Sequence, residues 1–238
     1  MRRDLIGRIQ QIFLIISILL FLVIALLAAQ AAGVPWASAG FWQPILPALP
    51  AKPQIVLISG HAGNDSGAVC TDAAGEVTLA EADVNAAVAK QVAERLRAAN
   101  RDVEIFNEFD QRLDGLSVDV LVSLHADSCV DFSGYKAAHR DNAPLPADSR
   151  LLACMDENYP AVTGLAYHPD TITHDMTDYH VFRKIDPSTP ALILEMGFLG
   201  GDRALLTDGA DRVAQGVADG IGCFLALSPA NPPPSITP

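Results

Sequence analysis

The sequence predicts an α/β fold, in which one domain with a mixed, mostly parallel sheet flanked by helices follows an N-terminal transmembrane or signal helix. Residues 55–59, 118–124 and 191–194 are short, almost wholly apolar segments, which are typical of buried strands. Segments with helical spacing of apolar residues lie between them. Strands that alternate with helices favour a parallel sheet, whose ligand crevice lies at the carboxyl ends of the strands.

The N-terminus predicts a membrane segment. Three arginines in a basic cytoplasmic segment, residues 1–11, precede an apolar run from residue 12 to 29 that is interrupted only by Ser17. The run is near the lower limit for a membrane span and longer than the core of most signal sequences. We therefore expect residues 12–32 to be a transmembrane anchor or a signal sequence, with the arginines inside.

The fate of this segment stays open at the level of sequence. Ala29-Gln-Ala31 and Ala37-Ser-Ala39 both fit the small-residue pattern of a cleavage site. The chain is therefore expected in the cell membrane, as a single-pass protein with its folded domain outside, or secreted after signal cleavage.

Two proline-rich segments delimit the predicted domain. Residues 33–53 contain several prolines and predict a linker, whose Trp36, Phe41 and Trp42 suit a membrane interface. Residues 228–238 predict a disordered tail, which leaves residues 54–227 as the folded domain. The net charge of −12 argues against a nucleic-acid partner.

The first half of the domain begins with a strand that stops in a glycine-rich turn carrying His61. A helix is expected from Thr78, because Thr78-Leu-Ala-Glu81 has the pattern of a capping box, and helical spacing continues through Ala99. Residues 101–106 alternate between apolar and polar and predict a short, half-exposed strand.

The second half repeats this design. The strand from Val118 runs into His125, and the strand after Pro190 ends in Glu195 and then glycines. A helix is expected from Ala147 to Pro160, a helical segment over residues 202–206, and a closing helix over residues 211–225. Residues 165–179 have the composition of a loop.

Cys70, Cys129, Cys154 and Cys223 lie in the part predicted to be exported, where disulfides persist. Their spacing is not that of a zinc-cysteine module. Cys70 and Cys129 each follow a histidine-bearing strand end by a few residues, so a bridge between them beside the site is one interpretation. Buried free thiols are the other.

The strand ends predict one metal site. A catalytic zinc commonly takes two histidines and one carboxylate and keeps a fourth position for water. His61 and His125 supply the histidines, and Glu81, at a helix start close after the first glycine turn, can supply the carboxylate. Structural histidines and a helix-stabilising Glu81 are the alternatives.

Four ordered motifs carry a resemblance to a known family. They are Gly60-His61-Ala-Gly63, Glu81-Ala-Asp-Val-Asn85, Ser123-Leu-His125-Ala-Asp127 and Leu194-Glu195-Met-Gly197-Phe198. This set resembles that of the zinc-dependent N-acetylmuramoyl-L-alanine amidases (amidase type 3). The resemblance implies a Zn²⁺ cofactor held by His61, Glu81 and His125, with Glu195 as catalytic acid/base. It also implies peptidoglycan as substrate, cut between N-acetylmuramic acid and L-alanine during cell-wall remodelling, and names no protein activator.

The chain departs from the family pattern at two places. Asp127 stands where the family commonly has Asn, and residues 198–201 read Phe-Leu-Gly-Gly where it commonly has Phe-x-Ser-Asn. These departures concern loop geometry and substrate preference more than the metal. An extracytoplasmic zinc hydrolase of another peptide or amide, and a catalytically silent wall-binding relative, are the alternative functions.

The other four histidines, His139, His168, His174 and His180, lie in polar or turn-rich stretches and are expected to be loop residues. Tyr179-His180 is the exception, because the resemblance places this stretch beside the crevice, where it could contact substrate.

Overall fold

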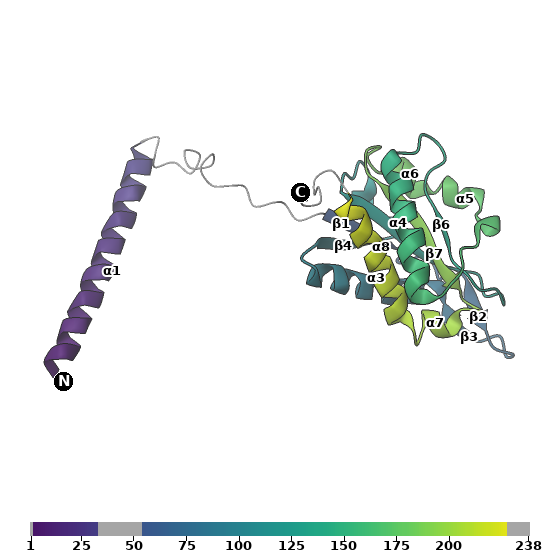
Figure 1. Cartoon of the computed structure of the whole chain (residues 1–238), viewed down its shortest axis with the longest axis horizontal. Coiled ribbons are helices and arrows are strands. Elements are labelled where there is room, and N and C mark those ends of the chain that lie inside the picture. Colours follow the sequence, from purple (N-terminus) through teal and green to yellow (C-terminus); the bar gives the residue numbers. More distant parts are fainter. Residues whose placement is uncertain (1, 33–53, 228–238) are drawn as a thin grey trace, which may run out of the picture. The chain divides into compact units, whose positions relative to one another are not determined.

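The computed structural model describes residues 2–32 and 54–227, with side chains from residue 12 onward. The linker predicted over 33–53, with its aromatic residues, and the tail predicted over 228–238 lie outside the described residues. The first described part is a long helix, α1 (Arg2–Ala31) (Figure 1). Its stretch Ile12–Ala31 has a mean hydropathy of 3.3 and is long enough to cross a membrane, a property that signal sequences share.

The domain is built on a five-stranded sheet in the order β4-β1-β5-β7-β6. The strands are β1 (Gln54–Ser59), β4 (Asp102–Asn107), β5 (Val120–Asp127), β6 (Lys136–Ala138) and β7 (Ala191–Phe198). The first four strands of the order pair in parallel, and β6 pairs antiparallel with β7. This confirms the predicted mixed, mostly parallel sheet.

Two apolar layers cover the sheet. One face packs against α3 (Glu81–Ala98), α4 (Pro146–Thr163) and α8 (Ala210–Ala226), which Figure 1 shows running across it. The other face packs against the short helices α5 (His174–Thr177) and α6 (His180–Lys184). Side chains of successive strand residues point to opposite faces. Along each strand, one residue therefore packs under the long helices α3, α4 and α8, and the next faces α6.

The predicted capping box at Thr78 is wrong. Residues Val77–Ala80 form strand β3, which pairs antiparallel with β2 (Val69–Thr71) in a small hairpin that the sequence did not predict. Helix α3 begins at Glu81 itself, and its N-cap Ala80 makes no side-chain hydrogen bond. The carboxylate of Glu81 therefore does not form a capping box with Thr78.

Three further elements differ from the prediction. Helix α4 continues past Pro160 to Thr163, where Gly164 adopts a left-handed conformation with φ 80°. Strand β6 lies in a stretch for which the sequence predicts neither a helix nor a strand. Residues 165–179, expected to be a loop, contain the short helices η3 (Pro169–Thr171) and α5. The remaining short helices are η2 (Gln111–Leu113) and α7 (Arg203–Leu206).

All four cysteines form disulfides, so the free-thiol interpretation is wrong. Cys70–Cys129 ties β2 to the segment after β5, as the first interpretation had it. Cys154–Cys223 links α4 to α8 on the far face of the sheet. The domain thus has one covalent link at the carboxyl edge of the sheet and one between packed helices.

We predict that the double substitution Cys154→Ala and Cys223→Ala lowers the free energy of unfolding by about 2–4 kcal/mol, because removing a crosslink between distant residues frees the unfolded chain. Urea unfolding of the full chain, followed by circular dichroism, measures the change. An unchanged midpoint would contradict a stabilising role for this bridge.

Candidate functional site

The first site residue, His61, lies in the turn that follows β1. Its backbone is in the left-handed region, with φ 65°, which is unusual for a residue other than glycine. Gly60 precedes it, and a Cβ atom at Gly60 would lie 2.4 Å from Cε1 of His125. Only glycine at this position lets the backbone after β1 approach the His125 ring so closely.

The residues His125 and Glu195 lie side by side on neighbouring strands. They are register partners in the parallel ladder of β5 and β7. Both alternate with residues of the core under the long helices, so they face the side covered by α6. Lys136 on β6 is the register partner of Glu195 on its other side.

The structure brings His61, Glu81 and His125 together as a group able to hold a metal. One nitrogen or oxygen atom from each lies within 4.8 Å of those of the other two. Oε1 of Glu81 is 3.3 Å from Nε2 of His61 and 3.1 Å from Nδ1 of His125. Two imidazoles and one carboxylate are a donor set that zinc prefers, with a fourth position left for water.

The surroundings of these histidines fit a metal site. Nδ1 of His61 is 2.6 Å from Oδ1 of Asp65, which holds the ring so that Nε2 points to Glu81. Nε2 of His125 is 3.5 Å from Oε2 of Glu108, while its Nδ1 faces Glu81. A carboxylate on the outer nitrogen of each histidine is the usual support for a metal-binding imidazole.

Glu81 is buried and held by several donors. Its Oε2 accepts a hydrogen bond from the Ala68 N–H at 2.9 Å, and its Oε1 accepts from Asn85 Nδ2 at 3.3 Å. Burial by itself would raise the pKa of Glu81, but the hydrogen bonds from His125 and the Ala68 N–H outweigh it and lower the pKa. The group is therefore a carboxylate, the form that binds a cation.

Glu195 has the opposite environment. Although the residue as a whole is partly exposed, its Oε2 is buried and has no hydrogen-bond partner among the described residues. Desolvation raises the pKa of Glu195 to about 7, against the lowering effect of the charge on His125. A carboxyl group with a pKa near neutrality both accepts and returns a proton, which is the property of a general acid/base.

The two departures from the family pattern have a structural reason here. Asp127 forms a salt bridge with the buried Lys136, so an acidic residue at this position balances a charge that would otherwise be unpaired. A Cβ at Gly200 would lie 2.2 Å from the Val130 carbonyl oxygen, and one at Gly201 would lie 2.0 Å from that of Phe132. The glycines let the segment after β5 lie directly against the end of β7.

Sequence reasoning missed Glu108, which is buried directly after β4. Its Oε1 accepts hydrogen bonds from Tyr179 Oη and His180 Nε2, both at 2.6 Å. Burial would raise the pKa of Glu108, but His180, the charge of His125 and Tyr179 lower it to about 2. The position of Glu108 just after a predicted strand could have indicated a site residue. Nothing in the sequence, however, indicated that this strand, β4, pairs with β1.

Of the four remaining histidines, only His180 reaches the site, through Glu108. The loop prediction for it is corrected in part, because it is the first residue of α6. His139 contacts the Arg140 carbonyl, and His168 contacts Thr171. Neither these two nor His174 belongs to the metal-capable group found among the described residues.

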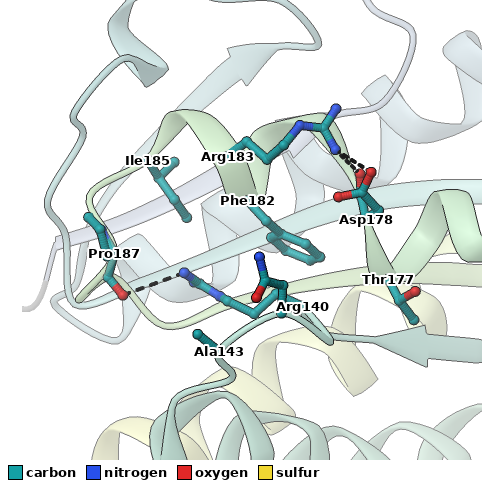
Figure 2. A pocket seen from close by; sticks show the side chains of 9 residues that line it. Arg140, Ala143, Thr177, Asp178, Phe182, Arg183, Ile185 and Pro187 are labelled. Atoms are coloured by element: carbon teal, nitrogen blue, oxygen red, sulfur yellow. Dashed lines mark hydrogen bonds and ion pairs between the residues drawn. The ribbon is translucent and has the colours of Figure 1, made fainter.

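A separate cavity of about 370 Å³ lies beside α6, away from the metal-capable group. Figure 2 shows Arg183 turned toward Asp178, and Arg140 turned toward the Pro187 carbonyl oxygen. Arg140 also contacts Asp148 and the Thr189 carbonyl oxygen. Because both cations already have partners within the protein, this cavity is a poor candidate for the functional site.

Comparison with known proteins gives a consistent result. A family model described as N-acetylmuramoyl-L-alanine amidase matches residues 55–223. The chain is 26% identical to the catalytic domain of CwlV, an N-acetylmuramoyl-L-alanine amidase from Bacillus (Paenibacillus) polymyxa var. colistinus, with a TM-score of 0.54 over 74% of this chain and 99% of that one. A sequence search of curated proteins found no match.

Two other solved structures show the same fold at lower identity. The CwlD amidase from Clostridioides difficile, in complex with the GerS lipoprotein, is 17% identical with a TM-score of 0.59, over 74% of this chain and 100% of that chain. An N-acetylmuramoyl-L-alanine amidase of Nostoc punctiforme is 22% identical with a TM-score of 0.54, over 74% of this chain and 99% of that chain.

We predict that Gly60→Ala weakens zinc binding by about 10–100-fold, because the added methyl group displaces the His125 ring from Glu81. Chelator competition with the purified full chain measures the dissociation constant. Gly222→Ala is the matched control, since a Cβ at that position meets no atom within 4 Å. Equal affinities in the two variants would contradict the placement of His125 in the metal site.

Proposed function

This chain belongs to the N-acetylmuramoyl-L-alanine amidase family and is a peptidoglycan amidase, and we propose that it works through zinc held by His61, Glu81 and His125, with Glu195 as the catalytic acid/base. The observation that carries the proposal is the convergence of the three ligand atoms within 4.8 Å, with Glu195 in register beside His125. When bound, zinc supplies a Lewis acid that polarises the amide carbonyl and makes water more acidic.

The reaction adds water across one amide bond of peptidoglycan. An oxygen–carbon bond forms at the lactyl carbonyl of N-acetylmuramic acid, and the bond from that carbon to the nitrogen of L-alanine breaks. The products are the lactyl carboxylate on the glycan and a stem peptide with a free amino group. One proton of the attacking water must reach the departing nitrogen, and the proton that the new carboxyl group loses is taken up by the released amino group.

Glu195 suits both proton transfers. A carboxyl group in an apolar strand has its charged form destabilised, which makes it ready to take a proton from the attacking water. The same proton is then delivered to the leaving nitrogen, so the group returns to its starting state. Its position on the inner strand β7, in register with His125 on β5, places it beside the proposed metal site and the carbonyl that would bind there.

The residues around Glu195 and the three proposed ligands differ in how exposed they are. Lys136, which pairs with the partly exposed Asp127, flanks Glu195 on the side away from His125. His61 is the most exposed of the three proposed ligands, with 29% of its side chain accessible. We therefore expect the substrate to approach the site from the His61 side.

The amidase acts on the cell wall outside the cytoplasm, and we propose that α1 is kept as a membrane anchor. Its apolar stretch Ile12–Ala31 has the length of a span, and the preceding arginines orient it with the N-terminus inside. The domain would then reach peptidoglycan from the outer surface of the membrane through the segment over 33–53.

The decisive test combines product analysis with zinc content. We expect Glu195→Gln to keep about one zinc per chain and to lose turnover of purified peptidoglycan by about 10²–10⁴-fold, because the general acid/base is gone. His125→Ala is expected to lose both zinc and turnover. Mass spectrometry of the digest identifies stem peptides with a free L-alanine amino group.

The exposed Glu157→Gln on α4 is the matched control and is expected to behave as the wild type. Full turnover by Glu195→Gln would contradict its catalytic role. Zinc binding without release of stem peptides would point instead to another amide substrate, and a wild-type chain without zinc would contradict the ligand assignment.

For the anchor, we expect the full chain to stay in the membrane fraction after carbonate extraction, with Met1 or Arg2 as its first residue. Replacing both Leu20 and Leu22 by arginine, near the middle of the span, should release the chain because each central charge costs about 2.5–3.5 kcal/mol on insertion. A mature protein that begins at residue 32 or 40 would show that the segment is a cleaved signal.

A further inference from the structure

We propose that Glu108, which lies outside the metal-capable group, is a positioning residue that orients both histidines of the centre. The inference rests on the zinc site proposed above. Glu108 directly follows β4, and 7% of its side chain is exposed. It is one of only a few buried acidic side chains in the described domain, and it faces His61 and His125 at the same time.

The first contact holds the backbone of His61. Oε2 of Glu108 accepts a hydrogen bond from the His61 N–H at 3.0 Å, and the Glu108 N–H donates to the Ala62 carbonyl oxygen at 3.2 Å. Two hydrogen bonds therefore tie the end of β4 to the turn after β1. That turn needs them, because the left-handed φ of 65° at His61 is disfavoured for a residue with a side chain.

The second contact orients the ring of His125. The same Oε2 lies 3.5 Å from Nε2 of His125, on the side of the ring opposite Nδ1 and Glu81. A negative charge at this place favours the proton on Nε2, which leaves the lone pair of Nδ1 directed at the metal position. Asp65 contacts the ring of His61 but not His125, so among the acidic groups outside the metal-capable group Glu108 is the one that contacts both histidines.

Glu108 is itself held from the other side. Its Oε1 accepts hydrogen bonds from Tyr179 Oη and His180 Nε2, each at 2.6 Å. Tyr179 Oη also lies 3.0 Å from Ser123 Oγ, two residues before His125 on β5. The carboxylate is thus fixed between β4, β5 and the start of α6, and it has little freedom to turn away from the histidines.

Other roles for Glu108 agree less well with this arrangement. It is not among the three residues whose ligand atoms converge, so it is not a fourth ligand in this structure. A purely structural carboxylate would need only its contacts with Tyr179 and His180. In Glu108, Oε1 is held by Tyr179 and His180, and Oε2 faces His61 and His125. A residue that positions the two histidines needs both sets of contacts.

The test compares Glu108→Ala and Glu108→Gln with the wild type in the full chain. We expect Glu108→Ala to bind zinc about 10–100-fold more weakly, the range found when support behind a metal ligand is lost. Glu108→Gln keeps the size and an oxygen acceptor but loses the charge, so its affinity should fall between those of Glu108→Ala and the wild type. Chelator competition gives the constants.

One further readout and a control variant separate positioning from general stability. Replacement of zinc by Co²⁺ gives visible absorption bands that report ligand geometry, and these should shift in both variants. Glu104→Gln is the matched control, because Glu104 lies on β4, the strand that Glu108 follows, but is 63% exposed and pairs with Arg112 at the surface. It should leave both the affinity and the bands unchanged.

Failure of the positioning role and failure of the proposed zinc site give different results. If the wild type binds zinc and Glu108→Gln binds it equally well with unchanged Co²⁺ bands, the positioning role is overturned while the zinc amidase stands. If Glu108→Ala fails to fold, the zinc affinity and Co²⁺ bands of Glu108→Gln decide whether Glu108 positions the histidines. If the wild type binds no zinc, the proposed metal site itself fails.

Discussion

The geometry of this enzyme depends on keeping the buried carboxylate of Glu81 ionised between two imidazoles. Burial of an unpaired charge is costly, and the structure offsets the cost with the N–H of Ala68, the amide of Asn85 and the two histidines. These partners come from the turn after β1, the first turns of α3 and the end of β5. The hairpin of β2 and β3 delivers Glu81 to this place, which is why α3 starts where it does.

The carboxyl edge of the sheet carries a second electrostatic arrangement around Glu195. Glu81 and Glu195 are both acidic and both near His125, yet one is stabilised as an anion and the other has its pKa raised to about 7. The difference follows from hydrogen bonding, since Oε2 of Glu195 has no partner among the described residues. Two carboxyl groups with opposite environments suit the roles proposed above, in which Glu81 holds the cation and Glu195 moves protons.

Three features fix the course of the segment after β5. Cys129 links it to β2, and the glycines at 200 and 201 accept its backbone at distances that no side chain would allow. Asp127 at its start pairs with Lys136 on β6. The segment is thus tied to β2 by a disulfide, to β6 by a salt bridge, and lies against the residues that follow β7.

The sequence by itself determined the four parallel strands of the sheet, β1, β4, β5 and β7, and the three residues of the metal-capable group. Its apolar strands end in His61, His125 and Glu195, and parallel strands place such ends at one edge. Only the tertiary structure decided that Glu108 belongs to the same site, because that depends on β4 pairing beside β1. It also decided that Val77–Ala80 pairs as a strand, where local pattern favoured a helix cap. Contacts between distant segments outweigh local preference at such places, and a single sequence does not encode them in any local pattern.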